Sequence, residues 1–75
     1  SRNTAAPAPA SDILSRRELD IMGLLAKGLT LTAIAEILSV SEHTVTTHVK
    51  KIYKKLNVHS RGEAIYEARQ LHLIQ

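Results

Sequence analysis

The sequence lacks cysteine, tryptophan and phenylalanine, and its only aromatic side chains are Tyr53 and Tyr66. Without cysteine the chain can form neither a disulfide framework nor a thiolate metal site, a composition that fits a reducing cytoplasm. The scarcity of aromatic rings argues against a platform that stacks the bases of single-stranded nucleic acid. No apolar run approaches the roughly 20 residues of a membrane-spanning helix, and no signal-peptide pattern is present. At 75 residues, the chain can form at most one small domain.

Acidic residues are absent between Glu42 and Glu63, although the net charge of the chain is only +3. The basic residues in that interval are Lys50, Lys51, Lys54, Lys55 and Arg61. A basic block in an otherwise balanced chain is expected of a surface that faces phosphate groups. The alternative is an ordinary helix with a solvated lysine face, so the spacing of the other residues has to decide.

Residues 1–11 (SRNTAAPAPAS) are small, rich in alanine and proline, and contain no bulky apolar side chain. Such a segment cannot bury enough surface to order itself and is typical of an interdomain linker. Because the chain begins at Ser1 rather than at methionine, we expect a fragment from which an upstream domain is missing. Residues 12–75 are then the one folded domain.

The first helix is predicted to begin after Ser15, because Ser15 and Glu18 are spaced for a capping box. Leu14 and Leu19 are spaced for a hydrophobic staple across the same start. Gly28 fits the left-handed residue just past the helix end. The core face of this helix is predicted to be Ile21, Met22 and Leu25.

Three further helices follow from the same kind of signal. The second is predicted to begin at Thr30, with its buried stripe at Ile34, Ala35 and Leu38. The third is predicted from the N-cap Ser41 to about Leu56, before the left-handed terminator Asn57. Its apolar residues recur at i, i+4, i+7 and i+11, at Val45, Val49, Ile52 and Leu56. Its opposite arc is polar and carries His43, Thr46, Thr47, Lys50, Lys51 and Lys54.

The fourth helix is predicted from a second capping box, formed by Ser60 and Glu63. Its inward side chains are expected to be Ala64, Ile65, Ala68 and Leu71. No strand pattern competes with these signals. The sequence therefore predicts an all-α fold, a compact four-helix (tetrahelical) helix-turn-helix domain.

The connection between the second and third helices, Ser39-Val40-Ser41, is too short for antiparallel packing and forces a steep crossing. Val40 can fill the corner, and the small side chain of Ala35 allows close contact. The polar N-terminal half of the third helix then protrudes, with its positive dipole end toward any anion. Short polar side chains followed by lysines fit DNA recognition, in which short side chains contact base edges and cations contact phosphates.

Three segments in register resemble the LuxR-type helix-turn-helix family, the C-terminal DNA-binding domain of NarL/FixJ response regulators and quorum-sensing regulators. They are LSRRELDIMGLLAKGLT, IAEILSVSEHTVTTHVKKIYKKLNV and SRGEAIYEARQLHLI, within Leu14 to Ile74. The resemblance implies a bacterial transcription regulator that binds duplex DNA in the cytoplasm, associated with the nucleoid, without a cofactor. It also implies that the helix from Glu42 to Leu56 enters the major groove.

The resemblance assigns roles to several side chains of that helix. Thr46, Thr47 and Lys50 occupy positions that usually face bases, and His43 faces DNA or solvent beside them. Thr44 occupies a position whose hydroxyl is expected to meet a phosphate. The family often has lysine where this chain has Thr46, a departure that removes a potential guanine contact and affects the preferred site.

Further phosphate contacts are expected around the recognition helix, from Thr30, Thr32, His48, Lys51, Lys54, Lys55 and Arg61. Two of these have an alternative, since Lys55 can lie along the apolar flank and His48 can be structural. Helix 61–71 resembles the element through which such domains dimerise on DNA. Its outward stripe comprises Gly62, Tyr66 and Arg69.

Metal-site and enzyme interpretations find little support. His43 and His48 lie on different sides of the helix, and His59 and His72 complete no ligand spacing. The sequence contains no nucleophile elbow, and so small a helical domain rarely builds a closed pocket. We therefore expect neither a metal nor catalysis.

Other classes of function remain open. The basic helix could lie on an acidic membrane or in a partner groove, although threonines stand where such helices carry apolar anchors. The domain could also be a protein-interaction or dimerisation module without DNA binding. For a DNA-binding regulator, the expected partners are a second copy, RNA polymerase, and an upstream domain that is either a phosphorylatable receiver or a ligand sensor.

Overall fold

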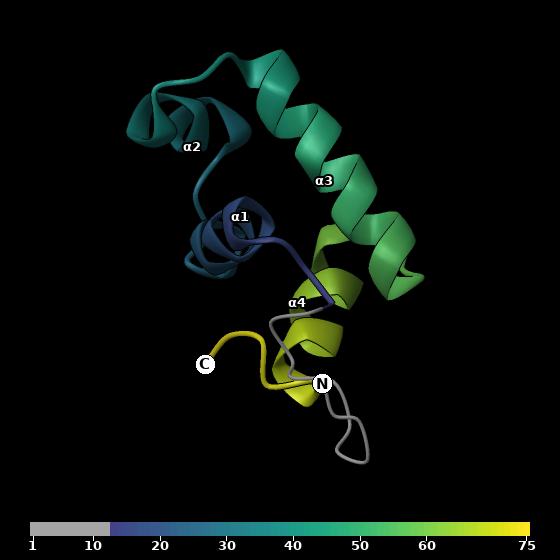
Figure 1. The fold of residues 1–75 in the computed structure, drawn as a ribbon. Helices are drawn as coiled ribbons and strands as arrows, with labels where there is room; N and C mark the ends of the chain where they lie inside the picture. The colour runs from purple at the N-terminus through teal and green to yellow at the C-terminus, as the bar shows by residue number, and fades with distance from the viewer. Residues whose placement is uncertain (1–12) are drawn as a thin grey trace, which may run out of the picture.

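The computed structural model describes residues 13–75, in which four helices and no strand are found. The helices are α1 (Arg16–Ala26), α2 (Leu31–Leu38), α3 (Glu42–Leu56) and α4 (Arg61–Gln70). In Figure 1, α3 runs along one side of the molecule, with α2 near its first turns and α4 near its last. Helix α1 lies between α2 and α4 and contacts all three other helices. The predicted all-α helix-turn-helix fold is confirmed, while the predicted linker at 1–11 lies outside the described residues.

The predicted helix starts are confirmed by their caps. At α1, the Glu18 N–H donates to Ser15 Oγ at 3.2 Å and the Ser15 N–H donates to Glu18 Oε1 at 2.7 Å. The Thr30 side chain caps α2, and that of Ser41 caps α3. Each satisfies a backbone donor that the helix leaves without an intrahelical partner.

The cap of α4 differs from the prediction. The Ser60 side chain accepts from the Glu63 N–H as expected, but the Glu63 carboxylate accepts from the N–H of His59 at 2.8 Å. Ser60 has a φ of −151°, whereas Ser15 has −68°. The N–H of Ser60 is therefore oriented differently, and the carboxylate meets the preceding donor. The reciprocal capping box predicted here is wrong by one residue.

The core lies where the four helices meet. Every side chain predicted for the cores of α1 and α3 is buried, as are Ile34, Ala35, Ala64 and Ala68. Leu38, Ile65 and Leu71 are only partly buried and pack against this core. Leu14 is buried just before α1, and Leu19 packs against the core, so both staple residues are apolar contacts.

Four residues have a left-handed backbone, and two of them were predicted. Gly28 has φ 88° and Asn57 has φ 56°. Ser39 (φ 58°) and His72 (φ 60°) were not predicted, because neither is a residue type that favours this region most strongly. Ser39 ends α2, and the Val40 N–H then donates to the Ala35 carbonyl at 3.0 Å, which turns the chain sharply into α3.

Within residues 13–75, no helix combines the length and the apolarity that a membrane crossing requires.

Candidate nucleic-acid interface

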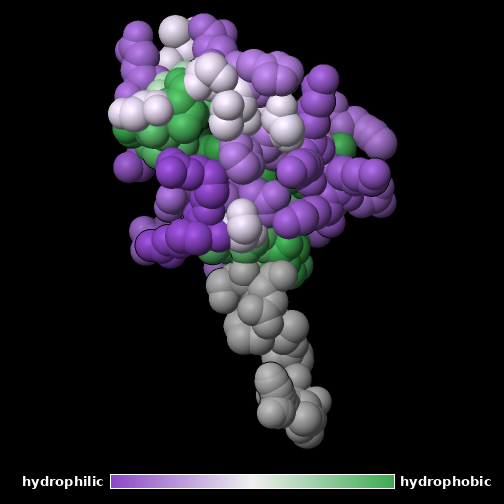
Figure 2. All heavy atoms as spheres, turned by 45° about the horizontal axis from the view of Figure 1, so that its top comes forward, coloured by the Kyte–Doolittle hydropathy of each residue, from purple (hydrophilic) through white to green (hydrophobic). Residues whose placement is uncertain are grey.

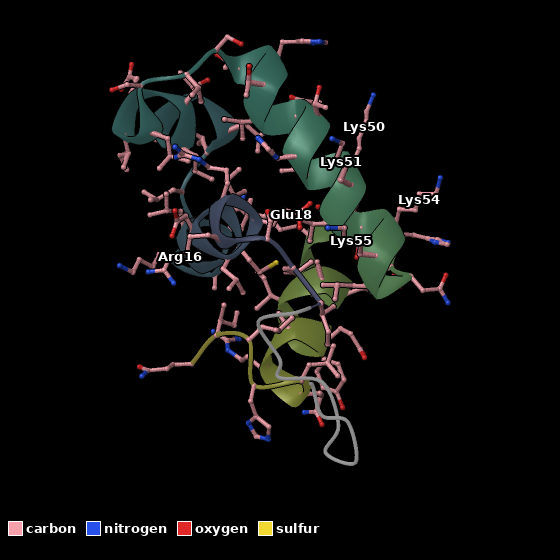
Figure 3. All side chains as sticks on the ribbon, viewed as in Figure 1. Arg16, Glu18, Lys50, Lys51, Lys54 and Lys55 are labelled. Atoms are coloured by element: carbon pink, nitrogen blue, oxygen red, sulfur yellow. The ribbon has the colours of Figure 1, made fainter. Side chains whose placement is uncertain are left out.

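Helix α3 has one apolar face and one polar face. Val45 and Ile52 are completely buried against α1, α2 and α4 or their neighbours. The exposed side chains of the opposite face are His43, Thr47, Lys50, Lys51 and Lys54, and Thr46 is half-buried beside them. In Figure 3, Lys50 and Lys54 extend away from the body of the molecule. The predicted division of this helix into a core face and a polar outer face is confirmed.

The surface that surrounds this face is hydrophilic. Figure 2 shows the upper end of the molecule tilted forward, with polar residues over most of it and a hydrophobic area on the side of α2. The large exposed aliphatic residue of α2 is Ile37, at 56% exposure. A polar, basic surface without a broad apolar patch suits a charged ligand better than an apolar one.

The N-termini of α2 and α3 both carry threonines with local hydrogen bonds. Thr30 Oγ1 accepts from the Ala33 N–H at 3.1 Å, which leaves the hydroxyl proton of Thr30 free to be donated. Thr44 Oγ1 lies 2.9 Å from Ser41 Oγ. Helix N-termini with such hydroxyls are suited to anion binding, because the dipole and the free backbone donors attract negative charge.

The Thr32 hydroxyl is already engaged within the protein. Its Oγ1 donates to Glu42 Oε2 at 2.8 Å, and both residues are exposed. A hydroxyl has a single proton, so Thr32 cannot donate to a phosphate while this bond persists. The sequence analysis missed this contact, because Thr32 and Glu42 lie on different helices.

His48 is half-buried, and its Nδ1 atom is buried without a hydrogen-bond partner among the described residues. A proton on Nδ1 would be a buried donor without an acceptor, which is costly. The neutral tautomer with hydrogen on Nε2 is therefore favoured. Nε2–H is a donor suited to a phosphate oxygen, provided that this edge of the ring faces outward.

Lys55 forms an ion pair with Glu18, at 2.7 Å between Nζ and Oε1. Glu18 is buried, at 3% exposure. Burial raises the pKa of its carboxyl, but hydrogen bonds from Lys55 and Ser15 and the charge of Lys55 outweigh it, so the pKa lies below its ordinary value. Figure 3 shows Lys55 turned toward Glu18 on α1, unlike Lys54. This lysine therefore anchors α3 to α1.

Arg61 also has a structural role that the sequence analysis missed. Its Nη2 donates to the carbonyls of Leu25, at 2.8 Å, and of Leu29. The Leu25 carbonyl belongs to the last turn of α1, where carbonyls lack intrahelical donors. Arg61 is thus committed to the end of α1, and we remove it from the proposed phosphate contacts.

The outer face of α4 includes the residues predicted for dimerisation. Gly62 and Arg69 are exposed, and Tyr66 is 64% exposed. Gly62 and Tyr66 share a shallow depression whose other lining residues are Asn57, Val58, Glu63 and Glu67. Arg69 lies apart from it and donates from Nε to the Gln75 carbonyl at 3.0 Å.

Histidines and carboxylates do not gather into a metal site in the described part of the chain, where no group of three or more potential ligands is found.

A short helix, a tight turn at Ser39 and a longer helix with a polar, lysine-bearing outer face define a helix-turn-helix DNA-binding domain. The description "bacterial regulatory proteins, luxR family" matches residues 12–68. The chain belongs to this family, as its resemblance had indicated. The family consists of transcription regulators and is not a family of enzymes.

Individual relatives agree with this assignment. The probable transcriptional regulatory protein NarL of Mycobacterium tuberculosis (strain H37Rv) is 40% identical over 67 residues, which are 89% of this chain and 31% of NarL. The nitrate/nitrite response regulator NarP of Escherichia coli (strain K12) is 47% identical over 52 residues, 69% of this chain and 24% of NarP. The chain thus spans less than a third of either relative.

Solved structures with the same fold include both a small protein and a larger one. The transcription factor GerE superposes with a TM-score of 0.80 at 33% identity, covering 84% of this chain and 94% of GerE. The response regulator ChrA of a heme-sensing two-component system gives 0.79 at 41% identity, covering 95% of this chain and 33% of ChrA.

Proposed function

We propose that this domain binds double-stranded DNA sequence-specifically as the C-terminal effector domain of a bacterial transcription regulator in the cytoplasm. Helix α3 enters the major groove with its polar face toward the base edges. The observation that carries the proposal is the segregation of α3, with Val45 and Ile52 fully buried and Lys50 exposed on the other side. The family membership supports the same conclusion.

Within this interface, base contacts come from the first half of α3, and the residues proposed are His43, Thr46, Thr47 and Lys50. Phosphate contacts flank them, and the residues proposed are Thr30, Thr44, His48, Lys51 and Lys54. Lys50 can pair with the O6 and N7 acceptors of guanine, whereas Lys54, one turn further on, suits a phosphate. The free hydroxyl proton of Thr30 and the Nε2–H of His48 are the donors that support their assignment.

Two copies of the domain bind together through α4, with Gly62 and Tyr66 against the partner. The exposure of Tyr66 and the depression beside it support this surface, since aromatic residues are enriched where proteins associate. Arg69 remains a peripheral candidate. Half-sites are then separated by about one helical turn, roughly 34 Å.

The whole regulator is a two-component response regulator, with a receiver domain upstream of residue 12 and residues 1–11 as the linker. This origin is supported by the similarity to NarP and ChrA, both described as response regulators. A ligand-sensing domain is the alternative upstream partner. RNA polymerase is the further partner that a transcription regulator on its promoter would contact.

The test is a fluorescence-anisotropy titration of the 75-residue chain with mixed-sequence duplex DNA at several salt concentrations. If each of two subunits contacts about four phosphates, the log-log salt slope should be near −7, at about −0.9 per contact. An affinity that does not change with salt would rule out phosphate contacts. Selection of bound duplexes from a random pool then gives the preferred site.

A further inference from the structure

The hydrogen bond between Thr32 and Glu42 connects the first turn of α2 with the first turn of α3. Its length of 2.8 Å is that of a good hydroxyl–carboxylate bond. It is the cross-helix side-chain bond of the helix-turn-helix unit in the described residues, besides which the capping bonds there are local. Both side chains are exposed at the end of α3 that leads into the groove.

Glu42 is an unusual charge for this position. It is the last acidic residue before a stretch that extends to Glu63 without another acid and contains four exposed lysines. Attraction to the positive end of the helix dipole gives a carboxylate here a simple stabilising role. That role requires neither a fixed rotamer nor a partner on α2, so it leaves the bond from Thr32 unexplained.

The bond to Thr32 restricts the Glu42 side chain and uses one of its two carboxylate oxygens. Lone pairs on the other oxygen remain available as acceptors. The N-terminal residues of a recognition helix are those that contact base edges. In the major groove, an ionised carboxylate can accept a hydrogen bond from the amino group of cytosine, and it is repelled by the acceptors of guanine and thymine.

We infer that Glu42, positioned by Thr32, reads the amino group of a base, with cytosine as the preferred partner. The inference rests on the proposed function and adds a specificity residue to it. Selection works in two ways, because the carboxylate gains a hydrogen bond from an amino donor and is repelled by acceptor-only base edges. Thr32 thus acts on DNA through Glu42, as a positioning residue.

The experiment compares the preferred sites of the wild-type chain and its variants, each selected from a random duplex pool. Glu42→Ala should lose the preference at one base pair of each half-site, reducing discrimination there by about fivefold or more. Glu42→Gln should shift that preference toward adenine, with which an amide pairs well. Thr32→Val keeps the charge but releases the carboxylate, and it should weaken discrimination at the same base pair by a smaller factor.

Glu36→Gln is the matched control, because it removes the same charge from an exposed residue on α2. It should leave the preferred site unchanged. In a Glu42→Ala background, Thr32→Val should cause no further loss of discrimination, since the residue that it positions is gone. Circular dichroism establishes that each variant is folded.

The inference is overturned if Glu42→Ala and Glu42→Gln change the affinity for all duplexes by one common factor. That outcome would mean that Glu42 acts only through its charge on the helix end or on the phosphates. The proposed function fails separately, if the wild-type chain shows no salt-dependent affinity for any duplex.

Discussion

The two halves of α3 differ in how they are held. The C-terminal half is tied to the rest of the domain by the ion pair between Lys55 and the buried Glu18. The N-terminal half presents its polar residues outward, and its side-chain bonds are to neighbouring caps and to Thr32. One half of the helix therefore serves as the anchor, and the other is free to contact a ligand.

Lys54 and Lys55 show the same difference between adjacent residues of one type. In Figure 3, Lys54 extends outward, whereas Lys55 turns toward Glu18. On a helix, neighbouring residues are about 100° apart, so a single step moves a side chain from solvent to the edge of the core. A lysine run is thus not uniform, and its members have to be tested separately.

The largest expected effect is on stability, from Lys55→Met. Removal of the ammonium leaves the carboxylate of Glu18 buried without its ion partner, which should lower the free energy of unfolding by about 2–3 kcal/mol. Lys54→Met, the matched control, should change it by less than about 0.5 kcal/mol. Urea denaturation measures both. Equal effects of the two variants would contradict the assignment of Lys55 as an anchor.

The next effect concerns binding by the N-terminal half of α3. Lys50→Ala should weaken binding to the selected duplex by about 2 kcal/mol and reduce the preference at one base pair, if Lys50 reads a base. Lys54→Ala should weaken binding to all duplexes alike and make the salt slope less steep by about 1. Anisotropy titrations against the selected site and its single-base variants distinguish the two. A uniform loss with Lys50→Ala would make it a phosphate contact.

A smaller effect is expected at the turn that orients the free half of α3. Ser39 has a left-handed backbone (φ 58°), which glycine adopts with less strain. Ser39→Gly should therefore stabilise the fold by about 0.5–1 kcal/mol, after allowance for the flexibility of glycine in the unfolded chain. Thermal unfolding measures the gain. Asn57→Gly should gain less, because asparagine tolerates this region better than serine.

The smallest effect is the pH dependence that the anchor introduces. The pKa of Glu18 lies below its ordinary value of 4.5, so its contribution to stability is present above that pH and is lost as pH falls through the lowered pKa. Stability measured between pH 7 and 3 should decline with acid, and Glu18→Gln should decline less. Lys55→Met should begin its decline at a higher pH. Identical pH profiles for the wild type and Glu18→Gln would contradict this role.

Much of the interface could be predicted because it depends on spacing along one helix. The polar arc of α3, with Lys50 and Thr47, follows from its period of 3.6 residues, and the structure has both exposed. The fate of Arg61 could not be predicted in this way. Its basic neighbours suggested a phosphate contact, but the carbonyls that it meets belong to Leu25 and Leu29, more than 30 residues earlier.

By itself the sequence determined the four helices, their serine and threonine caps, and the apolar stripe of each. These depend on interactions within about four residues, which are visible in the chain as written. Only the tertiary structure decided which basic residues remain free, since the partners of Lys55 and Arg61 lie 37 and 36 residues away. The pairing of Thr32 with Glu42 likewise required the tight turn at Ser39, because the turn sets the crossing of α2 and α3.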